Sequence, residues 1–277
     1  MIGVILVFIS ALLAEISNAM GKFAFAHKLE QPAMMGFLNT GWVVGYFALI
    51  ALFVPGGFHL VPATIPWLGV LIFLGGLQTV VSLFALRRAS RSTFGLLRAL
   101  TIPALALIDL GTGVALSPLK LVAMGLMCAS IMWLHRNHGI DRRGAGLVLF
   151  TAMNGAVTIA MLKQVLNMGT SVAAAQLFIL VPILFFLAAW SLRSAHTHFK
   201  GHGTLLSIQT ASYGAASLVG SYALPFAPAS VIATALRASE VLWAIISGKV
   251  AFHEDHVKEK LIGGGAILIG LLLLAFG

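Results

Sequence analysis

Apolar residues run along the whole chain in long blocks that are separated by short polar connections. The blocks are about 18 to 24 residues long, which is enough for a helix to cross a lipid bilayer. They lack the alternation of apolar and polar residues that membrane β-barrels show, and this favours helices. We therefore predict an all-α membrane protein with ten transmembrane helices, over residues 2–25, 33–54, 65–86, 90–110, 117–134, 145–166, 171–192, 203–224, 228–250 and 258–276.

Two pairs of similar segments indicate an internal repeat. Leu97-Arg98-Ala99 recurs as Leu236-Arg237-Ala238, 139 residues later in a chain of 277, and Ala19-Met20-Gly21-Lys22 resembles Ala160-Met161-Leu162-Lys163. Each half then holds five spans, and an odd number places the second half upside down relative to the first, as in many transporters. The first five-helix repeat is predicted at residues 1–137, the connecting loop at 138–143 and the second five-helix repeat at 144–277.

The charged residues are few and lie mainly between the apolar blocks. Only 9% of residues are charged and 60% are hydrophobic, whereas soluble domains carry roughly 25% charged residues. The net charge of +9 therefore indicates contact with anionic lipid, and we expect no nucleic-acid partner.

Of the 17 Lys and Arg residues, 13 lie at or beside the odd-numbered connections. The positive-inside rule then places these connections in the cytoplasm and both termini outside, in a bacterial inner membrane. A reporter protein fused to the C-terminus would test this orientation.

The closing part of the chain resembles a known transporter family. Ala251-Phe252-His253-Glu254 is followed by Gly263 in an apolar last helix. With the five-plus-five arrangement, this is similar to an EamA-type member of the drug/metabolite transporter superfamily. In that family each half tends to end in a glycine-glutamate turn and a helix with a glycine about nine residues on. Here His253 stands where the family has glycine. The resemblance implies a secondary carrier of small polar metabolites, amino acids or drugs, often an exporter.

Arg98 and Arg237, related by the repeat, are the first candidates for a substrate site. A charge deep inside an apolar span is costly and is by default a functional-site hypothesis. A guanidinium offers a planar fork that suits a carboxylate or phosphate. The two arginines could therefore face one anionic group where the halves meet. The alternative is structural: Arg98 extends to the membrane surface, and Arg237 pairs with Glu240, three residues on in the same helix.

Glu15, Asn18 and Lys22 form a polar stripe on the first predicted helix. Burial in an apolar medium favours the neutral form of a carboxylate, which lets it exchange protons near neutral pH. Glu15 is also similar in placement to the first-helix glutamate that small multidrug members of the same superfamily use for proton coupling. The matching position of the second half is Ala156, which carries no proton. The alternative is that Glu15 holds helices together by pairing with Lys22 or Arg237.

Further polar and aromatic residues inside the spans are candidates for lining a central cavity. Amides and a phenol can orient a polar substrate, although they can equally join helices. Tryptophans away from the span ends can line a cavity for a bulky substrate. These candidates are Asn39, Gln78, Asn154, Gln176, Tyr213, Trp42 and Trp243, and Gln209 belongs to the same group of polar positions.

The chain holds nine histidines, which cluster in the connections. They lack the acids or cysteines that would complete a zinc site, and no phosphate loop, dinucleotide motif or nucleophile elbow is present. We therefore expect no metal, no cofactor and no enzyme activity.

The expected function is a secondary transporter, an exporter of a small polar metabolite such as an amino acid or organic anion, proton-coupled and working by alternating access. The expected assembly is a monomer or weak homodimer. The alternatives are a lipid-carrier flippase on the same fold and a membrane-embedded enzyme that uses the histidine-rich face.

Overall fold

The computed structural model describes residues 2–27, 29, 31–111, 117–136, 141–193, 203–223, 226, 229–252 and 257–276. These residues form helices and turns, and no strand occurs in the part of the chain that they cover, which confirms the predicted all-α class. The elements are α1 (Ile2–Ala26), α2 (Pro32–Phe53), the 3-10 turn η1 (Pro62–Thr64), α3 (Ile65–Arg88), α4 (Arg91–Arg98), α5 (Thr101–Gly111), α6 (Pro118–Arg136), α7 (Ala145–Asn167), α8 (Val172–Arg193), α9 (Gly203–Ala223), α10 (Ala229–Phe252) and α11 (Val257–Phe276).

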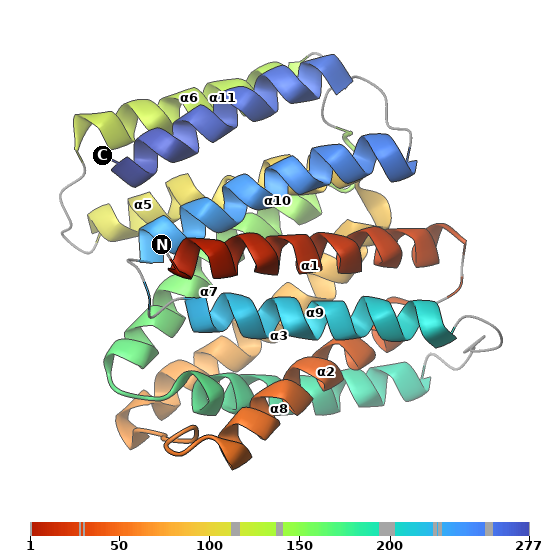
Figure 1. The fold of residues 1–277 in the computed structure, drawn as a ribbon, viewed down its shortest axis with the longest axis vertical. Helices are drawn as coiled ribbons and strands as arrows, with labels where there is room; N and C mark the ends of the chain where they lie inside the picture. The colour runs from red at the N-terminus through yellow and green to blue at the C-terminus, as the bar shows by residue number, and fades with distance from the viewer. Residues whose placement is uncertain are drawn as a thin grey trace.

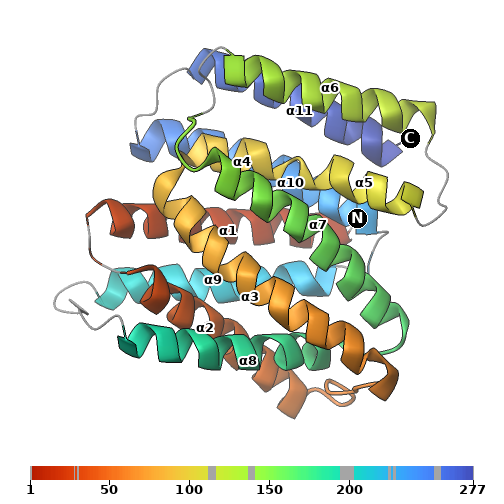
Figure 2. The ribbon, with the colours of Figure 1, turned by 180° about the vertical axis from the view of Figure 1, so that it is seen from behind.

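The apolar block over 90–110 does not form one helix, so that prediction is wrong. It is divided into α4 and α5, which follow one another along one line (Figure 2). Pro103 is the cause, because a proline has no N–H and its ring conflicts with the carbonyl four residues earlier, here that of Ala99. The Thr101 hydroxyl donates to the Arg98 carbonyl oxygen at 2.8 Å, which satisfies a carbonyl at the break. In the predicted repeat Pro103 corresponds to Leu242, and α10 continues through Leu242 without a break.

Five helices are long and apolar enough to cross a membrane: Ile5–Ala26, Pro32–Phe53, Pro62–Arg88, Ala145–Asn167 and Val172–Arg193. Large apolar side chains on these helices point outward, for example Leu52 and Phe73, which are 77% and 70% exposed. Exposed apolar surface of this extent is stable against lipid and not against water. The chain therefore has the character of an integral membrane protein.

The helices form layers that lie roughly side by side (Figure 1). The pair α6 and α11 is at one edge and the pair α2 and α8 at the other, with α10, α1 and α9 between them. Helices α3 and α7 pack against each other across the back (Figure 2). Helix α1 begins and α11 ends at the same end of the bundle (Figure 1). We call this the terminal end, and the other end, where α3 stops and α4 begins, the closed end.

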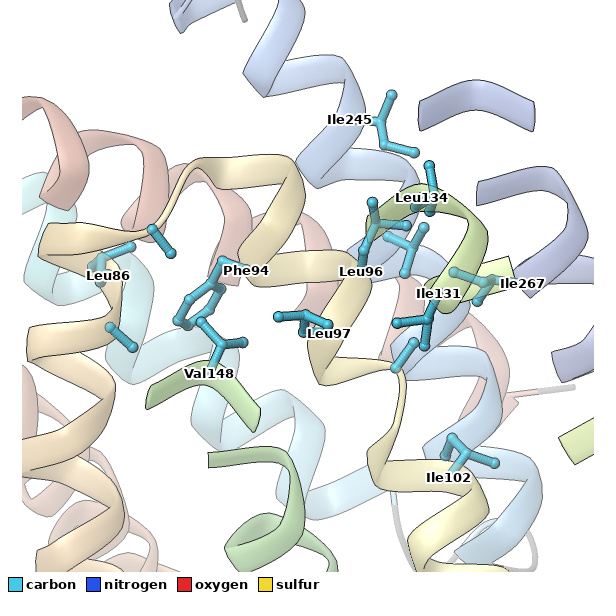
Figure 3. Close-up of a cluster of buried hydrophobic side chains, with 14 of the residues drawn as sticks. Leu86, Phe94, Leu96, Leu97, Ile102, Ile131, Leu134, Val148, Ile245 and Ile267 are labelled. Carbon is cyan, nitrogen blue, oxygen red and sulfur yellow. The ribbon is translucent and has the colours of Figure 1, made fainter. Parts of the chain in front are cut away.

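A cluster of buried apolar side chains fills the bundle around α4 and extends to the closed end. It joins Leu86 of α3, Phe94 and Leu97 of α4, Val148 of α7 and Ile245 of α10, together with residues of α6 and α11 (Figure 3). Polar contacts add to this packing. The Lys22 ammonium donates to the Ala89 carbonyl oxygen, and the Thr93 hydroxyl accepts from the Asp141 N–H at 2.9 Å.

Gly144 allows the connection before α7 to lie close against the end of α3. It has a φ of +77°, and a Cβ built on it would lie 3.0 Å from both the Ala89 nitrogen and the Arg88 Cβ. A left-handed conformation in such a space favours glycine strongly. The closed end is thus fixed by apolar packing, by side-chain hydrogen bonds and by one tight turn.

Candidate functional site

A cavity of about 800 Å³ lies between α1, α2, α3, α4, α7, α9 and α10. This volume lies within the range of small-molecule sites, about 300–1,000 Å³. At the closed end the lining residues are apolar and buried, among them Leu83, Leu86 and Phe94. Toward the terminal end the lining includes Lys163 and Asn167, which are exposed, and Ser221 near the end of α9. The lining is thus buried at the closed end and exposed at the terminal end, which indicates that the cavity opens toward the terminal end.

Arg98 and Arg237 meet at one carboxylate in the wall of this cavity. Arg237 Nη1 lies 2.5 Å from Glu240 Oε2, and Arg98 Nη1 lies 3.8 Å from Glu240 Oε1. All three residues line the cavity. The sequence places the two arginines 139 residues apart, and the fold brings them to the two oxygens of a single side chain.

The two arginines differ in how tightly they are held. The Arg237 side chain is 5% exposed, and its Nη1 donates a charge-assisted hydrogen bond to Glu240. The Arg98 side chain is 23% exposed, and its distance to Glu240 is too long for a hydrogen bond. Its guanidinium carbon also lies 5.3 Å from the centre of the Phe94 ring, a cation–π contact. Arg237 is thus the close partner of Glu240, and Arg98 is the more accessible cation.

The guanidinium groups of both arginines contact other side chains of the protein. The sequence alternative that Arg98 extends to the membrane surface does not apply in this structure, since its guanidinium lies beside Phe94 and Glu240. The alternative that Arg237 pairs with Glu240 does apply. Both residues nevertheless line the cavity, so the pairing and a site role coexist.

Gln209 organises a second polar group in the cavity wall. Its side-chain nitrogen donates to Ser17 Oγ at 2.9 Å and to Asn39 Oδ1 at 3.1 Å, so it joins α9 to α1 and α2. Its side-chain oxygen is buried and has no hydrogen-bond partner in the described structure. Asn18 and Tyr213 line the same cavity. Tyr213 is one helical turn from Gln209 and within electrostatic range of Arg98.

Gln78 lines the cavity and also joins α3 to α7. Its nitrogen donates to the Thr151 carbonyl oxygen at 3.1 Å, and its oxygen accepts from Asn154 at 2.8 Å. The Asn154 nitrogen donates as well to the Leu74 carbonyl oxygen at 3.0 Å. Asn154 is not a lining residue, so its amide serves to connect helices. Gln176 is also outside the lining, where its nitrogen lies 3.5 Å from Ser221 Oγ.

The three residues of the predicted polar stripe on α1 contact different parts of the protein. Asn18 lines the cavity, whereas Glu15 and Lys22 do not. Glu15 is buried and accepts a hydrogen bond from the Ser247 hydroxyl of α10. Lys22 donates to the end of α3. The stripe exists as a helix face, but only its middle residue reaches the cavity.

The two candidate tryptophans lie outside the cavity. Trp42 is 43% exposed on α2 and packs on Tyr46, with ring centroids 5.6 Å apart. Trp243 packs on Phe8, also at 5.6 Å, and its buried Nε1 has no hydrogen-bond partner in the described structure. Both tryptophans were predicted to line the cavity because they lie away from the ends of their spans. The position of a residue along a span does not determine the direction of its side chain, so this prediction could not be made reliably.

Several lining residues were not among the candidates taken from the sequence. The most informative is Lys163 of α7, which is exposed and forms no ion pair with any described residue. The sequence already pointed to this residue, because Lys163 matches Lys22 in the predicted repeat. Thr79, Ser82 and Ser217 also add polar groups to the wall.

The cavity carries an excess of positive charge. Among the residues that the structure describes, the charged lining residues are Arg98, Lys163, Arg237 and Glu240, which gives a net charge of +2 from three cations and one carboxylate. Among the described residues no group of three or more His, Cys, Asp and Glu side chains could hold a metal ion. The predicted histidine-rich face lies largely outside the described residues, as do His253 and Glu254 of the closing motif.

No protein-family model matches the chain, and the search of curated proteins also finds no match. The arrangement of the cavity therefore carries the functional interpretation by itself.

Proposed function

We propose that the protein is a secondary transporter of a small polar metabolite, working as an exporter by alternating access across a bacterial inner membrane. The cavity carries this proposal. It is large enough for a metabolite, it is open at one end of the bundle and sealed at the other, and its polar wall is built from both halves of the chain. A site with these properties between membrane helices is typical of secondary transporters.

The pattern of helix neighbours supports two inverted repeats of five spans each. Under the predicted repeat, α1 corresponds to α7, α2 to α8, α3 to α9, α4 and α5 to α10, and α6 to α11. When each helix is replaced by its counterpart in the other repeat, the pair α1 and α9 becomes the pair α7 and α3. The helices of both pairs are in contact. The contact of α1 with α10 likewise becomes that of α7 with α4 and α5. Helices α2 and α8 pack on each other, as do α6 and α11, which is expected of pairs beside a two-fold axis.

The directions of the helices agree with inversion. In Figure 2, α1 runs away from the terminal end, whereas its counterpart α7 runs toward it. If each repeat crosses the membrane five times, α4 and α5 together form one discontinuous span. Discontinuous spans recur at the binding sites of such transporters, and Arg98 is the last residue of α4. On the predicted orientation the cavity faces outside.

The resemblance to the EamA-type family is part of the proposal. Gly263 of α11 lies against Leu134 of α6, since a Cβ built on it would clash with that side chain. A glycine at this place in the last helix thus permits the close contact between α6 and α11, the last spans of the two proposed repeats.

Flux measurements in proteoliposomes test the proposed function. The purified protein is expected to exchange at least one member of a panel of amino acids and organic anions faster than empty liposomes. Ser217→Trp, which fills the cavity, is expected to stop this exchange. Ser191→Trp, outside the cavity lining, serves as the matched control. If wild-type protein moves none of the panel, the proposed function is wrong. If both tryptophan variants keep full flux, the cavity is not the transport pathway.

Glu15 is the proposed proton-coupling residue. It is buried in the contact between α1 and α10 and accepts a hydrogen bond from the Ser247 hydroxyl. Ser247 lies on α10, seven residues after Glu240. Glu15→Gln is expected to abolish transport driven by a pH gradient while keeping exchange at equal pH, because glutamine retains the hydrogen bond but cannot bind and release a proton. Uptake by the variant that still follows the pH gradient would exclude Glu15 as the coupling group.

A further inference from the structure

The excess charge of the cavity is located on Arg98 and Lys163. Glu240 is committed to Arg237 at 2.5 Å, so that pair is neutral. Arg98 keeps only a loose relation to Glu240 at 3.8 Å, and Lys163 forms no ion pair with the described residues. Two cations in one cavity favour a ligand with net negative charge, because an uncompensated charge is costly away from water.

Arg98 is placed to bind an oxyanion. Phe94 supports its guanidinium from one side at 5.3 Å, and nearly a quarter of the side chain is exposed. Its N–H groups form no hydrogen bond in the described structure. A guanidinium has five N–H donors in a rigid fork, which matches the two oxygens of a carboxylate or phosphate. The resident carboxylate of Glu240 marks the direction from which an anion approaches.

Gln209 indicates a second feature of the ligand. Its nitrogen is fixed by Ser17 and Asn39, so its oxygen is left as a buried acceptor without a donor. Leaving such a buried acceptor unpaired is unfavourable. The residue is 1% exposed and lines the cavity, so a ligand in the cavity could supply the donor.

We propose that the substrate is a small hydroxylated organic anion, such as a hydroxy acid or a sugar phosphate. Its carboxylate or phosphate binds Arg98, while Glu240 stays on Arg237, and its hydroxyl donates to the side-chain oxygen of Gln209. Lys163, nearer the terminal end, attracts the anion into the cavity. This inference rests on the transport function proposed above and names the substrate class of the same site.

Binding to the full-length protein in detergent tests this without any need for transport. The probes are malate, succinate, glycerol 3-phosphate, serine and glycerol, and the readouts are thermal stabilisation and the dissociation constant. Malate or glycerol 3-phosphate is expected to bind, and succinate, which is malate without its hydroxyl, to bind about tenfold more weakly, as one lost hydrogen bond predicts. Neutral glycerol and zwitterionic serine are expected to bind weakest.

Two variants and one matched control test the role of Arg98. Arg98→Gln is expected to weaken binding of the anion at least tenfold, whereas Arg193→Gln, the same change on an exposed arginine outside the cavity, is expected to leave it unchanged. Glu240→Gln is expected to strengthen binding several-fold, because the competing carboxylate is neutralised while its oxygen still accepts from Arg237. A gain in affinity cannot result from misfolding.

The outcomes separate this inference from the proposed function. Anion binding without flux would keep the inference and overturn the transporter. Flux of serine or glycerol without anion binding would keep the transporter and overturn the inference. Binding of neither malate nor glycerol 3-phosphate, or equal binding by wild type, Arg98→Gln and Glu240→Gln, would also overturn it.

Discussion

Replacing Glu240 with leucine is expected to lower the free energy of unfolding by about 3–5 kcal/mol, the cost of breaking a buried ion pair by removing one partner. Arg237 would keep its charge with a side chain that is 5% exposed and with an Nε that already has no hydrogen-bond partner in the described structure. Arg98 would lose its nearest anion as well. Two guanidiniums would then face each other across one cavity without a counter-ion.

The double variant Arg237→Leu/Glu240→Leu separates the lost pair from lost packing. Removing both charges is expected to recover most of the stability, since apolar replacements of a buried pair are often neutral or favourable. Thermal unfolding in detergent, monitored by tryptophan fluorescence, measures both variants against wild type. Leu242→Ala, an exposed neighbour on α10, is the control for a change on this helix. If Glu240→Leu is as stable as wild type, Glu240 does not hold the arginines in place.

The helix positions could be predicted because the lipid imposes one length and one composition on each segment. Blocks of about 20 apolar residues have few alternatives to a helix when backbone groups find no water. The two arginines could be predicted as a pair for a related reason. The predicted repeat places Arg98 and Arg237 at equivalent positions in the two halves, and equivalent positions of an inverted repeat are expected to meet at its centre.

Other features depended on contacts that a single sequence does not show. Pro103 breaks the span over 90–110, whereas Pro182 lies inside the continuous helix α8, so proline alone did not decide the outcome. Glu15 and Asn18 share a helix face in the sequence, yet Ser247 of α10 holds one and the cavity receives the other. The direction of each side chain was set by the neighbouring helix, and the order of the helices is long-range information.

The distance between α4 and α10 determines whether Arg98 can reach Glu240, and Gly95 sets that distance. Gly95 lies one turn before Arg98 on α4. A Cβ built on it would lie 2.6 Å from the Ala244 Cβ and 3.4 Å from the Glu240 carbonyl oxygen, both on α10. Small residues permit this kind of close approach between membrane helices. The absence of a side chain at position 95 is therefore part of the site.

Gly95→Val is accordingly expected to push α4 away from α10, to lower the free energy of unfolding by about 1–3 kcal/mol through overpacking, and to abolish transport by moving Arg98 out of its position in the cavity wall. Gly125→Val on α6 makes the same chemical change where a new Cβ has nothing within 4 Å. That control is expected to be neutral or slightly stabilising, because valine has a better helix propensity than glycine. Thermal unfolding and flux of both variants, side by side, measure the effect. If Gly95→Val transports like Gly125→Val, the position of Arg98 beside α10 is not needed for function, and the site must be sought elsewhere in the cavity.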